Sequence, residues 1–141
     1  MEIKLLTDDA RMPTKATDGS AGYDIYATKN CILSAFGDTM EIHTGVAIWI
    51  QDPTICGLVV PRSGFSIRTK SHLWNTVGVI DSDYQGELVL YLAIPECFFV
   101  DANDRIAQII FTTITSPVFT QVINFTSETD RGKGGFGSTG K

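Results

Sequence analysis

The apolar residues of this chain occur in short runs of strand length, and this pattern limits its possible folds more than any other feature. The runs are rich in Val, Ile, Thr, Tyr and Phe, and turn-forming Gly, Pro and Asp residues separate them. They cover residues 25–27, 46–50, 55–60, 88–94, 106–111 and 118–123. Apolar residues nowhere repeat at helical spacing over three turns, and a short helix is plausible only at residues 63–70. The pattern predicts an all-β fold, either a sandwich or a barrel.

Length and composition narrow the class of protein further. The chain has 141 residues, of which 43% are hydrophobic, which is enough for one domain with a buried core. Eleven Lys and Arg against sixteen Asp and Glu give a net charge of −5, which disfavours nucleic acid as a partner. We find neither a membrane-spanning run nor a secretory leader at the start of the chain. We therefore expect a soluble, cytoplasmic protein, or one of the host cytoplasm or nucleus if a virus encodes it.

The cysteines and histidines do not suggest a metal site. Cys31, Cys56 and Cys97 are far apart and odd in number, and His43 and His72 have no second ligand nearby in sequence. We expect free thiols in a reducing compartment and no bound zinc.

The last stretch of the chain differs in composition from the rest. We expect residues 1–126 to form the domain and residues 127–141 to form a flexible arm, because glycine is frequent there and little can be buried. The arm also carries an arginine, an aromatic ring and two hydroxyls. Exposed glycine N–H groups together with Arg131 suit phosphate oxygens, so the arm could order on a ligand. Composition alone also allows a disordered Gly/Ser tail.

Two further stretches are candidates for anion binding and for buried charge. Residues 61–66 end an apolar run with Arg62, two hydroxyls and Gly64, which suits a phosphate but is also ordinary turn composition. Asp24 lies in an otherwise apolar strand, where a carboxylate needs a cationic partner. Arg62 is the partner that we predict.

Residues 77–89 read as a β-hairpin with a glycine in its first strand, where a flat ligand could approach the backbone. Asp81 follows two apolar residues, so we expect it to be partly desolvated and able to polarise a water or accept a hydroxyl proton. The alternative is that Asp81 and Asp83 only shape the turn.

Together, these stretches resemble the trimeric dUTPase family, whose five motifs occur here in order. They read SAGYDIYA at 20–27, PRSG at 61–64, GVIDSDYQG at 78–86, DRIAQ at 104–108 and RGKGGFGSTG at 131–140. The resemblance covers nearly the whole chain.

The resemblance implies a distorted jelly-roll β-barrel that forms a homotrimer, with three active sites at subunit boundaries and the glycine-rich arm closing over them. Its activity would be the Mg²⁺-dependent hydrolysis of dUTP to dUMP and pyrophosphate. Water would attack the α-phosphorus without a covalent intermediate. This activity keeps uracil out of DNA and supplies dUMP for thymidylate synthesis. Mg²⁺ would bind the triphosphate and waters, with no direct protein ligand.

The resemblance also implies roles for individual residues in recognising the nucleoside. The third motif would hold uracil through main-chain groups that include Val79 and Val89, with Ile80 also in the pocket, and would leave no room for a 5-methyl group. Tyr84 would stack on the sugar and exclude a ribose 2′-hydroxyl. Asp81 would accept the sugar 3′-hydroxyl and act as general base for the attacking water.

A second set of residues would bind the phosphates and the water. Gln108 and Arg131 would join Asp81 in catalysis, with Arg131 neutralising phosphate charge. Phe136 would stack over uracil. The remaining phosphate-side residues are Asp24 as a supporting acid, Arg62, Ser63, Gly64 and Asn75 along the triphosphate, and Gly137, Ser138 and Thr139 on the γ-phosphate.

Two alternatives keep the same barrel. The chain could be a nucleotide-sensing or partner-binding module without significant turnover, which the intact Asp81, Tyr84 and Phe136 disfavour. It could also belong to the related dCTP deaminase branch, which the short length and the complete arm motif disfavour.

Overall fold

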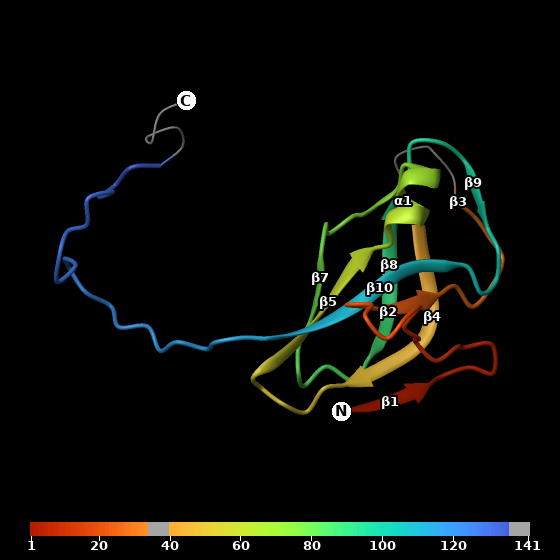
Figure 1. The fold of residues 1–141 in the computed structure, drawn as a ribbon, viewed down its shortest axis with the longest axis horizontal. Coiled ribbons are helices and arrows are strands. Elements are labelled where there is room, and N and C mark those ends of the chain that lie inside the picture. Colours follow the sequence, from red (N-terminus) through yellow and green to blue (C-terminus); the bar gives the residue numbers. More distant parts are fainter. Residues whose placement is uncertain (34–39, 136–141) are drawn as a thin grey trace.

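The computed structural model describes residues 1–33 and 40–135 and is built almost entirely of β-strands (Figure 1). One sheet has the strand order β1-β4-β8-β6, a second has the order β2-β10-β5-β7, and β3 pairs with β9. The first sheet comprises β1 Glu2–Leu5, β4 Met40–Trp49, β8 Glu87–Ala93 and β6 His72–Leu73. The second comprises β2 Tyr23–Tyr26, β10 Arg105–Thr113, β5 Ile55–Pro61 and β7 Gly78–Ile80. The small pair comprises β3 Cys31–Leu33 and β9 Phe98–Val100.

A single apolar core is formed by the inner faces of these sheets. Strand β8 shows the pattern most clearly, because Leu88, Leu90 and Leu92 are buried while the residues between them face outward. From the second sheet, Ile25 and Ile109 are fully buried in the same core. Burying a side chain of this size contributes about 1.5–3 kcal/mol. The all-β prediction is confirmed, and the period-two alternation explains it.

Within residues 1–33 and 40–135 the structure has one helix, α1 Ser63–Thr69, and it lies where the sequence predicts it. Its buried side chains are Phe65 and Thr69. Lys70 caps its C-terminal end with a φ of 54°, which lies in the left-handed region. None of the helices in the described part of the chain is long and apolar enough to cross a membrane.

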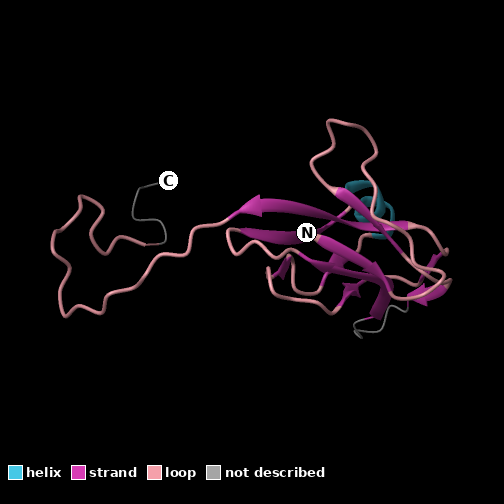
Figure 2. Ribbon diagram, turned by 90° about the horizontal axis from the view of Figure 1, so that it is seen from below, coloured by secondary structure: helices cyan, strands magenta, loops and turns pink. Residues whose placement is uncertain are grey.

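The predicted strand at residues 118–123 is wrong. After β10 the chain leaves the body and runs away from it without regular structure (Figures 1 and 2). Val118, Phe119 and Ile123 are each at least 90% exposed. The composition is that of a strand, but a strand forms only where a neighbouring edge can pair with it, and this segment projects away from its own sheets.

The predicted hairpin at residues 77–89 is also wrong as a paired element. Strand β7 pairs with β5 in the second sheet, whereas β8 pairs with β4 and β6 in the first. The connecting turn is present, since the Tyr84 N–H donates to the Asp81 carbonyl over 3.2 Å. The two strands therefore diverge from the turn into different sheets instead of pairing with each other.

A bulge in β4 fixes the start of β8. The register runs from His43 opposite Val89 to Ala47 opposite Glu87, so β4 has extra residues between these pairs. The Thr44 hydroxyl donates to the Leu88 carbonyl over 2.6 Å. Glu87 accepts the Gly45 N–H over 2.7 Å and a hydrogen bond from His43 Nδ1 over 3.0 Å. The bulge is therefore tied to β8 by side chains as well as by the ladder.

Gly45 is the residue on which this bulge depends, so Gly45→Ala should lower the free energy of unfolding by about 1–3 kcal/mol. Its φ is 65°, and an added Cβ would lie 2.6 Å from the Ala10 Cβ. Gly19→Ala is the matched control, because nothing lies within 4 Å of a Cβ built there. Urea unfolding at one fixed protomer concentration measures both variants. Equal losses in the two variants would contradict this role for Gly45.

The Glu87 carboxylate should make stability depend on pH. Burial raises its pKa, but the hydrogen bonds from His43 and Gly45 and the charge of His43 outweigh burial, and the net pKa is lowered. A carboxyl with a lowered folded-state pKa stabilises the fold above its unfolded pKa of about 4.3, and that contribution disappears as the pH falls through the folded-state value.

We therefore expect Glu87→Gln to cost stability at pH 7 and to cost progressively less as the pH falls towards about 3.5. Urea midpoints across that range measure the difference from the unsubstituted protein. Glu128→Gln, at an exposed position in the C-terminal segment, serves as control and should follow the unsubstituted curve. A Glu87→Gln deficit that stays constant with pH would refute the assignment.

Candidate active site

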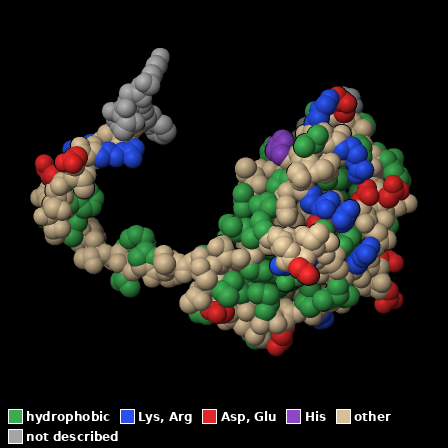
Figure 3. All heavy atoms as spheres, in the orientation of Figure 1, with side chains coloured by type: hydrophobic (Ala, Val, Ile, Leu, Met, Phe, Trp, Pro, Cys, Tyr) green, Lys and Arg blue, Asp and Glu red, His purple; other side chains and the backbone are tan. Residues whose placement is uncertain are grey.

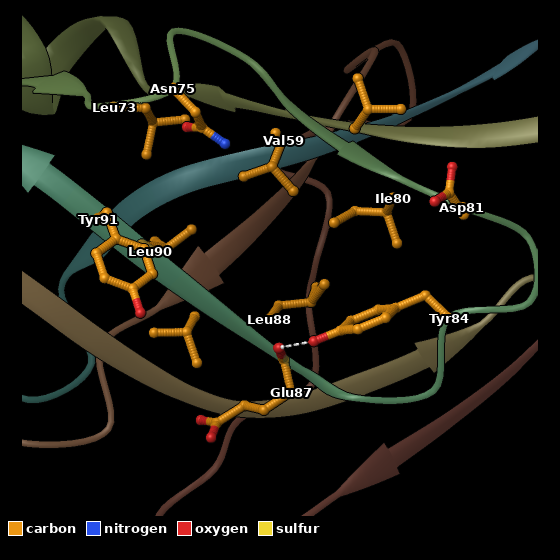
Figure 4. Close-up of a pocket in the computed structure, with 13 residues that line it drawn as sticks. Val59, Leu73, Asn75, Ile80, Asp81, Tyr84, Glu87, Leu88, Leu90 and Tyr91 are labelled. Atoms are coloured by element: carbon orange, nitrogen blue, oxygen red, sulfur yellow. Dashed lines mark hydrogen bonds between the residues drawn. The ribbon is translucent and has the colours of Figure 1, made fainter.

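The divergence of β7 and β8 opens a cavity of about 360 Å³ between them (Figure 4). Apolar side chains from β5, β7 and β8 form its walls, and polar groups lie at its ends. Its lining residues are Val59, Leu73, Asn75, Gly78, Val79, Ile80, Asp81, Tyr84, Glu87, Leu88, Val89, Leu90 and Tyr91. Six predicted site residues therefore line one cavity: Asn75, Val79, Ile80, Asp81, Tyr84 and Val89.

The main chain of β8 presents hydrogen-bonding groups to this cavity. The Tyr91 carbonyl accepts the Trp74 N–H over 2.8 Å, and the Glu87 carbonyl accepts the Tyr84 hydroxyl over 2.9 Å. Backbone groups in a strand alternate between its two edges, so Val89 faces the same edge as Glu87 and Tyr91, away from β4. Strand β6 pairs only with Leu92 and Ala93 of β8. On that edge no strand of the described residues is registered against Val89, so its N–H and C=O face the cavity.

Two of the predicted polar residues of this cavity, Asp81 and Tyr84, lie at its rim. Figure 4 shows Asp81 at the end of β7 and the Tyr84 ring extending along the cavity towards Glu87. The expectation that Asp81 is partly desolvated is wrong for this chain, because Asp81 is exposed. Strand β7 ends at Ile80, and the carboxylate therefore lies just beyond the apolar part of the wall.

A second pocket, of about 290 Å³, contains the residues of the first, second and fourth motifs. It is lined by Ala16, Ser20, Gly22, Asp24, Arg62, Ser63, Gly64 and Gln108. Strands β2, β5 and β10 bring them together, because β10 pairs with both β2 and β5. Five predicted phosphate-side or catalytic residues are therefore neighbours in the fold.

Asp24 is buried in this pocket between two arginines. Arg62 Nε lies 2.6 Å from Asp24 Oδ1, and Arg105 Nη1 lies 3.4 Å from Oδ2. The predicted pairing with Arg62 is confirmed. The Arg105 contact was not predicted, although Arg105 lies within the quoted fourth motif. Because two arginines face a single carboxylate, these three side chains together carry a net positive charge beside the pocket.

Gly22, just before β2, leaves room for the side chain of Gln108 on β10. A Cβ on Gly22 would lie 2.6 Å from Gln108 Oε1. The Gln108 amide in turn donates to the Pro61 carbonyl over 3.4 Å. This close approach holds the Gln108 side chain against the end of β5. In the sequence, Gly22 inside the first motif was the signal for this close contact.

The two pockets share no lining residue, so one chain divides the predicted site into two parts. Arg131 belongs to neither part and lies in the extended C-terminal segment, where its Nε donates to the Gly134 carbonyl over 3.1 Å. The predicted residues Phe136, Gly137, Ser138 and Thr139 lie outside the described residues.

Sequence reasoning also missed side chains around the first cavity. Leu73, Leu88 and Leu90 form part of its wall, and they carried no signal beyond strand alternation. Glu87 and Tyr91 line it as well, from outward-facing positions of β8. An alternating pattern identifies such positions as surface but does not indicate which cavity they border.

The carboxylates of the described residues do not form a metal cage. Within 1–33 and 40–135, no group of three or more His, Cys, Asp or Glu side chains is placed to hold an ion. Both oxygens of Asp24 already face arginines. A divalent cation at this site would therefore need ligands from a bound nucleotide and from water.

Comparison with known proteins agrees with this geometry. A family model described as dUTPase matches residues 8–140. The deoxyuridine 5′-triphosphate nucleotidohydrolase of Actinobacillus pleuropneumoniae serotype 3 is 42% identical over 133 residues, covering 92% of this chain and 87% of the relative. The protein of the same name from Legionella pneumophila strain Paris is 42% identical, covering 100% of this chain and 97% of the relative.

Solved structures give the same result. A variant of the dUTPase of Staphylococcus bacteriophage 80alpha with dUpNHpp aligns with a TM-score of 0.88 at 28% identity, covering 99% of this chain and 98% of that one. A dUTPase variant from phage phi11 of S. aureus, described with a structural Mg(II) ion, aligns with a TM-score of 0.81 at 25% identity. The alignment covers 88% of this chain and 97% of that one. The predicted jelly-roll fold is thereby confirmed, and the chain belongs to the dUTPase family.

Proposed function

We propose that this protein hydrolyses dUTP to dUMP and pyrophosphate. The observation that carries the proposal is the cavity between β7 and β8, where main-chain groups of β8 face a space with apolar walls. A flat, polar-edged base fits such a slot, because main-chain N–H and C=O groups can pair with its edge while the walls cover its faces.

Base selectivity follows from that arrangement. The Val89 N–H and C=O present a fixed donor and acceptor, which suit uracil and leave buried groups unpaired against cytosine. Thymine adds a methyl group, and we propose that the walls formed by Ile80 and Val79 leave no space for it. The hydrogen-bond mismatch should discriminate more strongly than the methyl contact does.

We assign sugar recognition and the chemical step to the cavity rim. Tyr84 stacks on the deoxyribose and occupies the space that a ribose 2′-hydroxyl needs. Asp81 accepts the 3′-hydroxyl and, as general base, orients the water that attacks the α-phosphorus. Its exposure in the single chain leaves it accessible to substrate and water.

The triphosphate lies, in this proposal, at the second pocket. Arg62 with Ser63 and Gly64 bind phosphate oxygens there, and Gln108 lines the triphosphate and the water. Asn75 lines the triphosphate from the first cavity, and Arg131 neutralises charge as pyrophosphate leaves. The two arginines facing Asp24 support an electropositive pocket. The protein contributes positioning and electrostatic stabilisation, and no covalent intermediate is required.

Mg²⁺ is the cofactor that we propose. The ion neutralises triphosphate charge when bound, and its ligands are phosphate oxygens and waters. The engagement of both Asp24 oxygens by arginines supports this placement, because it leaves that carboxylate as a support for Arg62 and Arg105.

We further propose a homotrimer whose active sites are shared between subunits. The division of the site residues between two separate pockets supports sharing. The C-terminal segment supports sharing as well, because apolar side chains along it are exposed and lie away from the body (Figure 3). A second copy of the chain would cover them. Residues 127–141 then act as an arm that closes over a neighbour's site and brings Phe136, Gly137, Ser138 and Thr139 to the nucleotide.

The substrate assignment is tested by comparing nucleotides. With Mg²⁺ present, we expect pyrophosphate release from dUTP and very little from dTTP, dCTP or UTP, because each of these carries one group that the slot or Tyr84 rejects. Similar kcat/KM values for all four would contradict the pocket argument. Tight dUTP binding without turnover would instead favour a nucleotide-sensing module.

The shared site is tested by mixing two inactive variants. Truncation after Thr126 removes the arm, and Asp81→Asn removes the general base, so each should lose kcat by about 10² or more. If the arm closes over another subunit, refolding the two variants together in equal amounts should restore about a quarter of the sites. No recovery in mixed trimers, or full turnover by the truncated chain, would contradict the arm's proposed role.

A further inference from the structure

The Tyr84 ring is held by its own turn. Its hydroxyl donates to the Glu87 carbonyl over 2.9 Å, and the ring lies against residue 86. A Cβ on Gly86 would come within 2.6 Å of the ring atom Cζ. The phenol end of the ring therefore lies close against the backbone of the turn at Gly86, and its hydroxyl is bonded to the first residue of β8 (Figure 4).

Glu87 connects this ring to the bulge in β4. One carboxylate oxygen accepts the Gly45 N–H over 2.7 Å, and the other accepts a hydrogen bond from His43 over 3.0 Å. Both partners belong to β4, and the Glu87 side chain is only 23% exposed. The carboxylate thus fixes the position of the Glu87 backbone, and the carbonyl of that same residue holds the Tyr84 hydroxyl.

The geometry points to Glu87 as a positioning residue for sugar selection. Anchored on Gly45 and His43, it sets the height of the Tyr84 ring above the cavity and thereby the space available at the sugar 2′ position. This inference rests on the proposed function, in which Tyr84 stacks on deoxyribose. A shift of the ring by a few tenths of an ångström changes whether a hydroxyl fits, because close-packed groups tolerate little added volume.

The test is the ratio of kcat/KM for dUTP to that for UTP. Glu87→Ala keeps the carbonyl and the strand pairing but removes the side-chain bonds to His43 and Gly45, so the ratio should fall by about tenfold as UTP gains access. Glu87→Gln keeps a side-chain oxygen that can accept the Gly45 N–H, and it should restore most of the discrimination. Tyr84→Phe keeps the ring but loses the tether, and it should lower the ratio as Glu87→Ala does.

Glu41→Ala is the matched control. Glu41 lies on the same outward face, 3.9 Å from His43 Nε2, and accepts a hydrogen bond from Tyr91, whereas Glu87 is the residue bonded to Tyr84. Its ratio should remain within about twofold of the unsubstituted protein.

The outcomes separate this inference from the proposed function. If folded Glu87→Ala keeps the dUTP-to-UTP ratio of the unsubstituted protein, the role of Glu87 is overturned. The same follows if Glu41→Ala lowers that ratio as much as Glu87→Ala does. If Glu87→Ala does not fold, Tyr84→Phe decides, and an unchanged ratio there overturns the tether. Failure of the unsubstituted protein to cleave dUTP would instead refute the proposed function.

Discussion

The site depends on one constraint, which is that β7 and β8 leave their shared turn for different sheets. A paired hairpin would satisfy the facing N–H and C=O groups of both strands and leave no space between them. Here β5 pairs with β7, and β4 pairs with β8. The β8 edge opposite β4 remains available to a ligand around Val89. The cavity is therefore a consequence of sheet topology, and its walls are the side chains that the divergence exposes.

The second part of the site depends on a buried charge. Asp24 would be costly in the core alone, and two arginines from β10 and the end of β5 compensate it. The same contact holds Arg62 beside Ser63 and Gly64. Asp24 thus orients a cation towards the pocket, and this explains why an acid belongs in a site that we assign to phosphates.

The sequence was sufficient to predict an all-β fold, a short helix at 63–70 that the structure has at 63–69, and the Asp24 pairing with Arg62. Those features depend on local pattern or on the cost of an isolated charge. The separation of β7 from β8 could not be predicted, because both are apolar and a tight turn joins them. The irregular conformation of residues 118–123 could not be predicted either. Their composition is that of a strand, but no sheet edge in the described part of this chain lies beside them to pair with. Arg105 was missed because the register of β10 on β2, rather than sequence distance, brings it to Asp24.

The most direct measurement of the main-chain slot is the amide signal of Val89. In protein labelled with nitrogen-15 valine, titration with dUMP should shift the Val89 amide strongly, because its N–H would pair with the uracil edge. The same concentration of dTMP should leave that amide nearly unchanged. If dUMP binds and the Val89 signal does not move, the base is not read by the free edge of β8, and the account of the site is wrong.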